Sequence, residues 1–118
     1  GVIDMITDGQ EEREFLYAQD CCEALETVMN NYSDFKSDDE LHVTSFNSIK
    51  IIDIAYIIQQ NFDMIGKKVD IKPSIDIDTV QQNSKNIASK YLTNWWKPRT
   101  SLDDGISKVF TSMKKNYD

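Results

Sequence analysis

The residues of this chain that could do chemistry are few, and they do not form a complete catalytic set. His42 is the only histidine, and it lies in an apolar segment, which favours a structural or surface role. Tyr32 and Lys36 have the Tyr-x-x-x-Lys spacing of a proton-transfer pair. A working pair shares one face of a helix, whereas these two residues follow the end of a predicted helix. We therefore expect no catalytic residue in this chain.

Acidic and aromatic residues in the second half of the chain suggest two further kinds of site. Asp70, Asp76 and Asp78 could bind calcium, but the glycine and the last glutamate of a calcium loop are missing. A solvated acidic edge is favoured, and no metal is expected. Trp95 and Trp96 could stack on a ring of a ligand. A tryptophan ahead of a proline-containing turn more often seals the edge of a core, and that interpretation is favoured here.

Arg13 is the one cation in an acidic stretch near the N-terminus. A guanidinium can hold a phosphate through its planar fork, or it can pair with a neighbouring carboxylate on the surface. Because Glu11, Glu12 and Glu14 are its neighbours, the residues alone favour the surface ion pair.

Composition is typical of one small folded domain with an acidic surface. The chain has 118 residues, 40% of them hydrophobic, and a formal net charge of -7. Lys and Arg are scattered, which argues against a nucleic-acid partner, and no run of 18 apolar residues predicts a membrane span. The four glycines are isolated, so no glycine-rich loop for a cofactor is expected. Adjacent Cys21 and Cys22 suit a reducing compartment, and we expect a cytoplasmic protein.

Hydrophobic periodicity predicts a small α/β unit with three firm helices, one weak helix and a few short strands. Asp20, with Glu23 three residues on, is predicted to cap the first helix, which ends near Asn30. The clearest helix spans about 49–62, and Gly66 follows it. The remaining predicted elements are strands at 2–6, 15–17, 41–44 and 69–71, a weak helix at 84–92, and a last helix capped by Thr100 or Ser101.

Apolar side chains recur at helical spacing in the first and last predicted helices. The first helix is expected to pack these residues in the core: Cys21, Leu25, Val28, Met29 and Tyr32. The last helix is expected to present these residues on one face: Leu102, Ile106, Val109, Phe110, Met113 and Tyr117.

Three stretches resemble the extended short-chain dehydrogenases, which are NAD-dependent nucleotide-sugar epimerases and dehydratases. Residues 9–20, G-Q-E-E-R-E-F-L-Y-A-Q-D, resemble that family's G-x-x-x-R-x-F-x-Y-V-x-D. Residues 41–58 are similar to its strand, turn and amphipathic helix. Residues 96–106, W-K-P-R-T-S-L-D-D-G-I, resemble its terminal L-G-W-x-P-x-T-S-L-x-E-G-I signature. The resemblance covers nearly the whole chain.

This resemblance implies that residues 1–118 are a single α/β lobe, the C-terminal substrate-binding part of such an enzyme. The N-terminal Rossmann half, which supplies NAD(P) and the catalytic Tyr and Lys, would be its partner. The resemblance also implies that Arg13 contacts the diphosphate or ribose of a nucleotide-sugar, and that Asp78 accepts a hydrogen bond from a ribose or sugar hydroxyl. The family's arginine three residues before Asp78 is replaced by Ile75, which leaves the nucleotide-sugar open.

The isolated fragment is expected to bind no cofactor and to turn over no substrate, and a homodimer is a candidate assembly. Two other functions fit the same residues: a degenerate, non-catalytic relative kept as a binding or assembly module, and a small α/β interaction domain with an accidental similarity. A true lobe should show unpaired strand edges and an exposed apolar face where its other half belongs.

Overall fold

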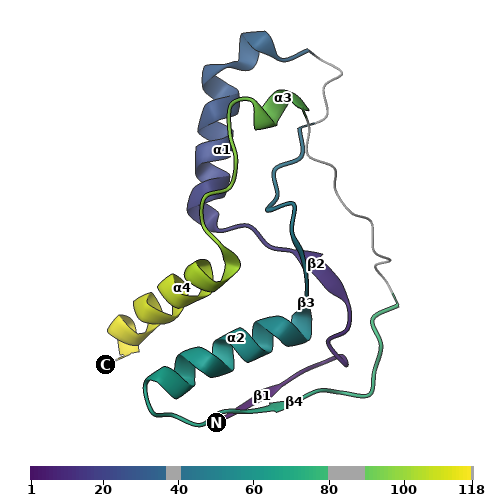
Figure 1. Ribbon diagram of the computed structural model, residues 1–118, viewed down its shortest axis with the longest axis vertical. Coiled ribbons are helices and arrows are strands. Elements are labelled where there is room, and N and C mark those ends of the chain that lie inside the picture. The colour runs from purple at the N-terminus through teal and green to yellow at the C-terminus, as the bar shows by residue number, and fades with distance from the viewer. Residues whose placement is uncertain (37–40, 80–89, 118) are drawn as a thin grey trace.

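The computed structural model describes residues 1–36, 41–79 and 90–117 of the chain (Figure 1). In chain order the elements are β1 (Val2–Asp4), β2 (Glu12–Glu14), α1 (Ala18–Asn30), the 3-10 turn η1 (Tyr32–Asp34), β3 (Ser48–Lys50), α2 (Ile51–Met64), β4 (Asp70–Lys72), α3 (Lys90–Thr93) and α4 (Leu102–Tyr117). The predicted small α/β unit with few short strands is confirmed.

The four strands form two separate two-stranded sheets. β1 pairs with β4 in parallel, with Ile3 opposite Ile71. β2 pairs with β3 antiparallel, with Arg13 opposite Ile49. Neither sheet gains a third strand from the described ranges, so each strand keeps one edge without a ladder partner there.

Two small clusters of packed side chains hold the helices. At one end of the molecule, Ala24 of α1 packs with Leu92 and Trp96, so the predicted core-sealing role is confirmed for Trp96, whereas Trp95 is 49% exposed. At the other end, α2 crosses α4 through the rings of Phe62 and Phe110, which meet edge to face at 4.9 Å. Figure 1 shows α1 and α3 at the first end, α2, β1 and β4 at the other, and β2 and β3 between them.

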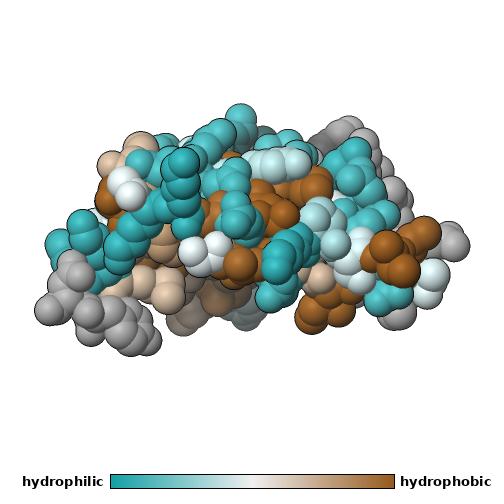
Figure 2. Space-filling view, turned by 90° about the horizontal axis from the view of Figure 1, so that it is seen from below, coloured by the Kyte–Doolittle hydropathy of each residue, from teal (hydrophilic) through white to brown (hydrophobic). Residues whose placement is uncertain are grey.

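The chain is more open than a compact domain of its size. Its radius of gyration is 17.3 Å, whereas a compact chain of this length has about 13.5 Å. Its accessible surface is 8742 Å², against about 6,600 Å² for a compact protein of this mass. Hydrophobic residues reach the surface on the side seen in Figure 2. The chain therefore has the open edges and exposed apolar surface expected of a lobe separated from its other half.

The predicted cap of the first helix is wrong. α1 begins at Ala18, and Tyr17 in the capping position makes no side-chain hydrogen bond to the helix. Asp20 lies in the first turn and is only 3% exposed. Its carboxylate accepts a hydrogen bond from the backbone N–H of Thr100, in a loop far away in the sequence. Glu23 accepts a hydrogen bond from the Gln19 side chain and so does not complete a capping box. A tertiary contact thus overrides the local pattern, because a buried carboxylate bonds the donors nearest to it.

Two predicted strands are also wrong. Residues 15–17 lie beyond β2, because the ladder partner β3 faces Glu12–Glu14 instead. Residues 41–44 have strand-forming composition but form no ladder with any described strand. Since strand stability comes from pairing with a neighbour, composition alone does not decide either segment.

The predicted core stripe of α1 is wrong in part. Leu25, Met29 and Tyr32 are exposed, Met29 by 77%. Ala24 is buried, and Val28 packs beside it. α1 thus carries apolar residues on two faces, which is typical of a helix covered on both sides.

Several helix and turn predictions are confirmed. α2 is formed two residues later than predicted, and Gly66 follows it with a φ of 73°. β4 stops before Pro73. Ser101 Oγ accepts a hydrogen bond from the Asp104 N–H at 3.2 Å and so caps α4. The weak helix predicted at 84–92 lies mostly outside the described residues.

Gly9 is expected to be the less replaceable of the two glycines with positive φ. Both Gly9 and Gly66 are left-handed, but an added Cβ at Gly66 meets no atom within 4 Å, whereas at Gly9 it would lie 3.0 Å from the backbone N of Ile52. We expect Gly66→Ala to lower the free energy of unfolding by about 1 kcal/mol and Gly9→Ala by about 2 kcal/mol. Urea unfolding of the full-length protein measures both. Equal losses would show that crowding at Ile52 contributes nothing.

Candidate functional site

Backbone hydrogen bonds extend the β1–β4 pairing toward β2. The bonds beyond the strands are Met5 N–H to Lys72 O (2.9 Å), Ser74 N–H to Thr7 O (3.0 Å) and Asp8 N–H to Asp76 O (2.8 Å). They hold the loop after β1 against the segment after β4. Asp78, two residues past the last of these bonds, is thereby brought to β2.

The loop between β1 and β2 is also fixed to the start of α2. The carbonyl oxygen of Gly9 accepts from the Ile52 N–H at 3.0 Å, and that of Glu11 accepts from the Ile51 N–H at 3.1 Å. These N–H groups lie in the first turn of the helix, where no partner within the helix exists. The first turn of the helix and the loop therefore satisfy one another's backbone hydrogen-bonding groups, and these bonds set the direction of β2.

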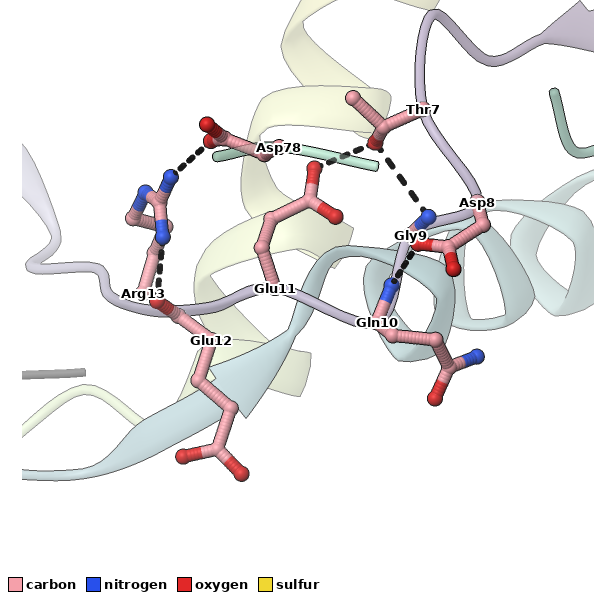
Figure 3. Close-up of polar contacts among 8 residues, drawn as sticks. All are labelled: Thr7, Asp8, Gly9, Gln10, Glu11, Glu12, Arg13 and Asp78. Atoms are coloured by element: carbon pink, nitrogen blue, oxygen red, sulfur yellow. Dashed lines mark hydrogen bonds and ion pairs between the residues drawn. The ribbon is translucent and has the colours of Figure 1, made fainter. Parts of the chain in front are cut away.

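Arg13 and Asp78, which the resemblance nominated separately, meet in the structure (Figure 3). The guanidinium Nη2 forms an ion pair with Asp78 Oδ2, across 65 positions of sequence. Nη1 donates to the backbone oxygen of Glu12 at 2.7 Å. The side chains are 25% and 20% exposed. The surface ion pair with Glu11, Glu12 or Glu14 that the residues alone favoured is wrong, because the carboxylate that Arg13 binds is Asp78.

This arrangement suits a ligand that has both an anion and hydroxyl groups. Arg13 offers a planar fork of N–H donors, which matches a phosphate. Asp78 is acceptor-only when ionised, so it matches a hydroxyl donor. Both groups remain partly exposed, so a ligand can reach them.

Glu11 is a residue of this site that sequence reasoning treated only as a possible ion-pair partner. Its Oε1 accepts from the Thr7 hydroxyl at 2.5 Å. Its Oε2 is buried and has no hydrogen-bond partner among the described residues. Period-two alternation along an extended chain, which places positions 11 and 13 on one side, was the signal available in the sequence.

The other residues considered for chemistry do not form a second site in the described part of the chain. Tyr32 lies in η1 and Lys36 beyond it, so the pair does not share a helix. Cys21 and Cys22 are free thiols. Within the described ranges no three metal-binding side chains gather, and none of the helices has the length and hydrophobicity of a membrane span.

An apolar groove of about 720 Å³ lies between α2 and α4. Phe62 and Phe110 are among its walls, and Lys67 and Lys114 also line it. Neither Arg13 nor Asp78 lines this groove, so the groove is separate from the polar site.

Solved structures share this fold over nearly the whole chain. A GDP-6-OMe-4-keto-L-xylo-heptose reductase from C. jejuni matches with a TM-score of 0.80 and 17% identity, over 98% of this chain and 34% of that one. A UDP-glucose 4-epimerase from Thermotoga maritima, solved with UDP-glucose, matches with a TM-score of 0.71 and 15% identity, over 98% and 36%. Three further neighbours were solved with NADPH, NADP or NAD.

The comparisons by sequence and by fold support the resemblance of this chain to the C-terminal part of the extended short-chain dehydrogenases of the nucleotide-sugar epimerase and reductase type. A relative by sequence is GDP-L-fucose synthase from Sinorhizobium fredii, which is 30% identical over 98% of this chain and 35% of its own length. The chain thus spans about a third of the proteins that it matches. No protein-family profile matches it.

Proposed function

We propose that this chain is the substrate-binding lobe of an NAD(P)-dependent nucleotide-sugar epimerase or reductase, and that it works with an N-terminal Rossmann half. The Arg13–Asp78 pair carries the proposal. It joins a phosphate-binding fork and a hydroxyl acceptor in one accessible place, which are the two groups that a nucleotide-sugar requires.

The cofactor does not fit the residues of this chain. Gly9 and Gly66 each occupy a single turn, and Gly105 is buried within α4. None of them belongs to a glycine-rich loop that could hold a dinucleotide phosphate. NAD(P) would therefore be held by the other half, where it would supply the hydride chemistry.

Three features of the described residues support a missing half as the partner. The chain has more surface than a compact protein of its mass. Leu25 and Met29 form a second, exposed apolar face on α1, and Tyr32, which follows in η1, is exposed as well. The β1–β4 sheet has two strands in the part of the chain described, so each of them has an edge to which a further strand could add. A neighbouring half that adds a strand there and covers the exposed apolar face would satisfy all three.

A GDP-sugar is the substrate class that we favour. The sequence relative and the heptose reductase are both named for GDP-sugars, whereas the epimerase is named for a UDP-sugar. Isomerase, lyase or reductase chemistry would be decided in the other half, because the described residues of this chain include no side-chain pair to which we assign acid–base catalysis. A cytoplasmic location is part of the proposal.

A ligand panel tests this function on the full-length protein. Thermal-shift measurements with GDP-, UDP-, dTDP-, CDP- and ADP-sugars should give a rise of several degrees for the correct class, because a ligand that binds only the folded state stabilises it. A GDP-sugar should give the largest rise. The proposal fails if no nucleotide-sugar shifts the melting temperature, or if the upstream sequence has no glycine-rich loop.

A non-catalytic binding module is the second candidate. Ile75 is highly exposed and stands where members of the resembled family often have an arginine, so one cation of the resembled pattern is missing. The upstream sequence discriminates, since a module kept for binding alone should lack Tyr-x-x-x-Lys. In that case the exposed apolar face would serve assembly, of which a homodimer is the simplest form.

A further inference from the structure

We propose that Glu11 is a third substrate contact in the Arg13–Asp78 site, where its free carboxylate oxygen accepts a hydrogen bond from a hydroxyl group of the bound nucleotide-sugar. The inference rests on the proposed function, and it adds a specificity-determining residue to it.

Glu11 points to the same side of the chain as the ion pair. Side chains alternate along an extended segment, so positions 11 and 13 share a side and position 12 faces the other way. Figure 3 shows this arrangement: the Glu11 carboxylate lies on the side of Thr7 and Asp78, and the Glu12 side chain points away. Backbone bonds to α2 fix the main chain of Glu11, so this direction is set by the fold.

One oxygen of the Glu11 carboxylate accepts a hydrogen bond, and the other has no hydrogen-bond partner in the described part of the chain. Thr7 Oγ1 donates to Oε1 at 2.5 Å and accepts from the Gly9 N–H at 3.3 Å, so its single proton is committed. Oε2 is buried without a hydrogen-bond partner in the described part of the chain. A buried carboxylate oxygen without a donor is unfavourable and needs an explanation, and a donor supplied by another molecule is the one that we propose here.

The chemistry of the three groups orients the ligand. Phosphate oxygens are acceptors and carry negative charge, so they bind Arg13 and avoid the two carboxylates. Carboxylates accept hydrogen bonds, so Glu11 and Asp78 face the part of the ligand that carries hydroxyl donors. A nucleotide-sugar has such donors on its ribose and on its sugar. Because Oε1 is already bonded to Thr7, Glu11 has one acceptor oxygen left for a hydroxyl.

The test replaces Glu11 in the full-length protein and measures affinity by calorimetry. Glu11→Gln keeps the shape of the side chain and removes the second acceptor oxygen, and Glu12→Gln is the matched control on the opposite side. The probes are GDP, 2′,3′-dideoxy-GDP and GDP-mannose, or the corresponding uridine compounds if the ligand panel selects UDP. We expect Glu11→Gln to weaken GDP-mannose binding about tenfold, and Glu12→Gln to leave it within twofold.

The probes separate the two hydroxyl sources. If Glu11 binds the ribose, Glu11→Gln weakens GDP and GDP-mannose alike but leaves dideoxy-GDP unchanged. If it binds the sugar, only GDP-mannose is weakened. Either pattern supports the contact.

Two results overturn the contact. One is unchanged affinity for all three probes in Glu11→Gln while Arg13→Ala still loses affinity, in which case the proposed function stands and the Glu11 inference fails. The other is an equal loss for every probe including dideoxy-GDP, which assigns Glu11 a purely structural role. Thr7→Val keeps the Glu11 carboxylate but removes the hydrogen bond that orients it. This variant should show the same pattern of affinity losses across the probes, but smaller ones. It keeps the contact testable if Glu11→Gln folds poorly. Absence of nucleotide binding by the wild type refutes the proposed function itself.

Discussion

Replacing Arg13 by alanine in the full-length protein is expected to raise the Kd for its nucleotide-sugar by roughly 10- to 150-fold, which corresponds to the ~1.5–3 kcal/mol of a charge-assisted hydrogen bond. The guanidinium is the cation that forms the ion pair with Asp78, so its removal takes the N–H donors of the planar fork out of the site (Figure 3). Calorimetric titration with the nucleotide-sugar selected by the ligand panel measures the change.

Arg13→Lys is the matched control for charge. Lysine keeps the positive charge but lacks the planar fork, so we expect it to recover only part of the lost affinity. The stability of the protein should change little in either variant, since Arg13 and Asp78 are both partly exposed and their ion pair is weakened by solvent. Wild-type affinity in Arg13→Ala would remove this residue from the binding site.

Replacing Asp20 by alanine is expected to lower the free energy of unfolding by about 2–3 kcal/mol, because two backbone N–H groups of a partly buried loop lose their acceptor. The Asp20 carboxylate accepts from the N–H groups of Arg99 (3.1 Å) and Thr100 (2.8 Å) and from the Thr100 hydroxyl (3.3 Å). It therefore ties the start of α1 to the loop before α4. Urea unfolding of the full-length protein measures the loss.

Asp53→Ala is the matched control for Asp20→Ala. Asp53 is the third residue of α2, as Asp20 is of α1, but its side chain is exposed. Its replacement removes only the attraction of an acid for the start of a helix, which is about 0.5 kcal/mol. If both variants lost the same small amount, the bonds to the loop would contribute nothing and Asp20 would act through the helix dipole alone.

The loop that Asp20 holds belongs to the terminal stretch that resembles the family signature. Thr100 bonds to Asp20, whereas Ser101 caps α4. Two neighbouring hydroxyl residues thus have different roles: Thr100 joins two elements, whereas Ser101 caps a helix. The sequence predicted that either of them caps the last helix, and spacing alone could not separate the two.

The sequence by itself determined the features that depend on near neighbours. The 3.6-residue period of apolar side chains placed α2 and α4 to within a few residues, because helical hydrogen bonds join residues four apart. Gly66 was predicted as the end of a helix because a left-handed turn there requires glycine. The matched motifs gave the fold class, and resemblance nominated Arg13 and Asp78.

Only the tertiary structure decided the features that depend on distant partners. Asp20 was read as a cap because the sequence does not show that Arg99 and Thr100 donate to it. Residues 41–44 were read as a strand, since composition reports strand preference but not the presence of a neighbouring strand. Arg13 was surrounded by glutamates in the sequence, yet the pairing of β1 with β4 brings Asp78 to it. Hydrogen bonds and ion pairs depend on distance in space, and folding sets that distance for residues that the chain keeps far apart.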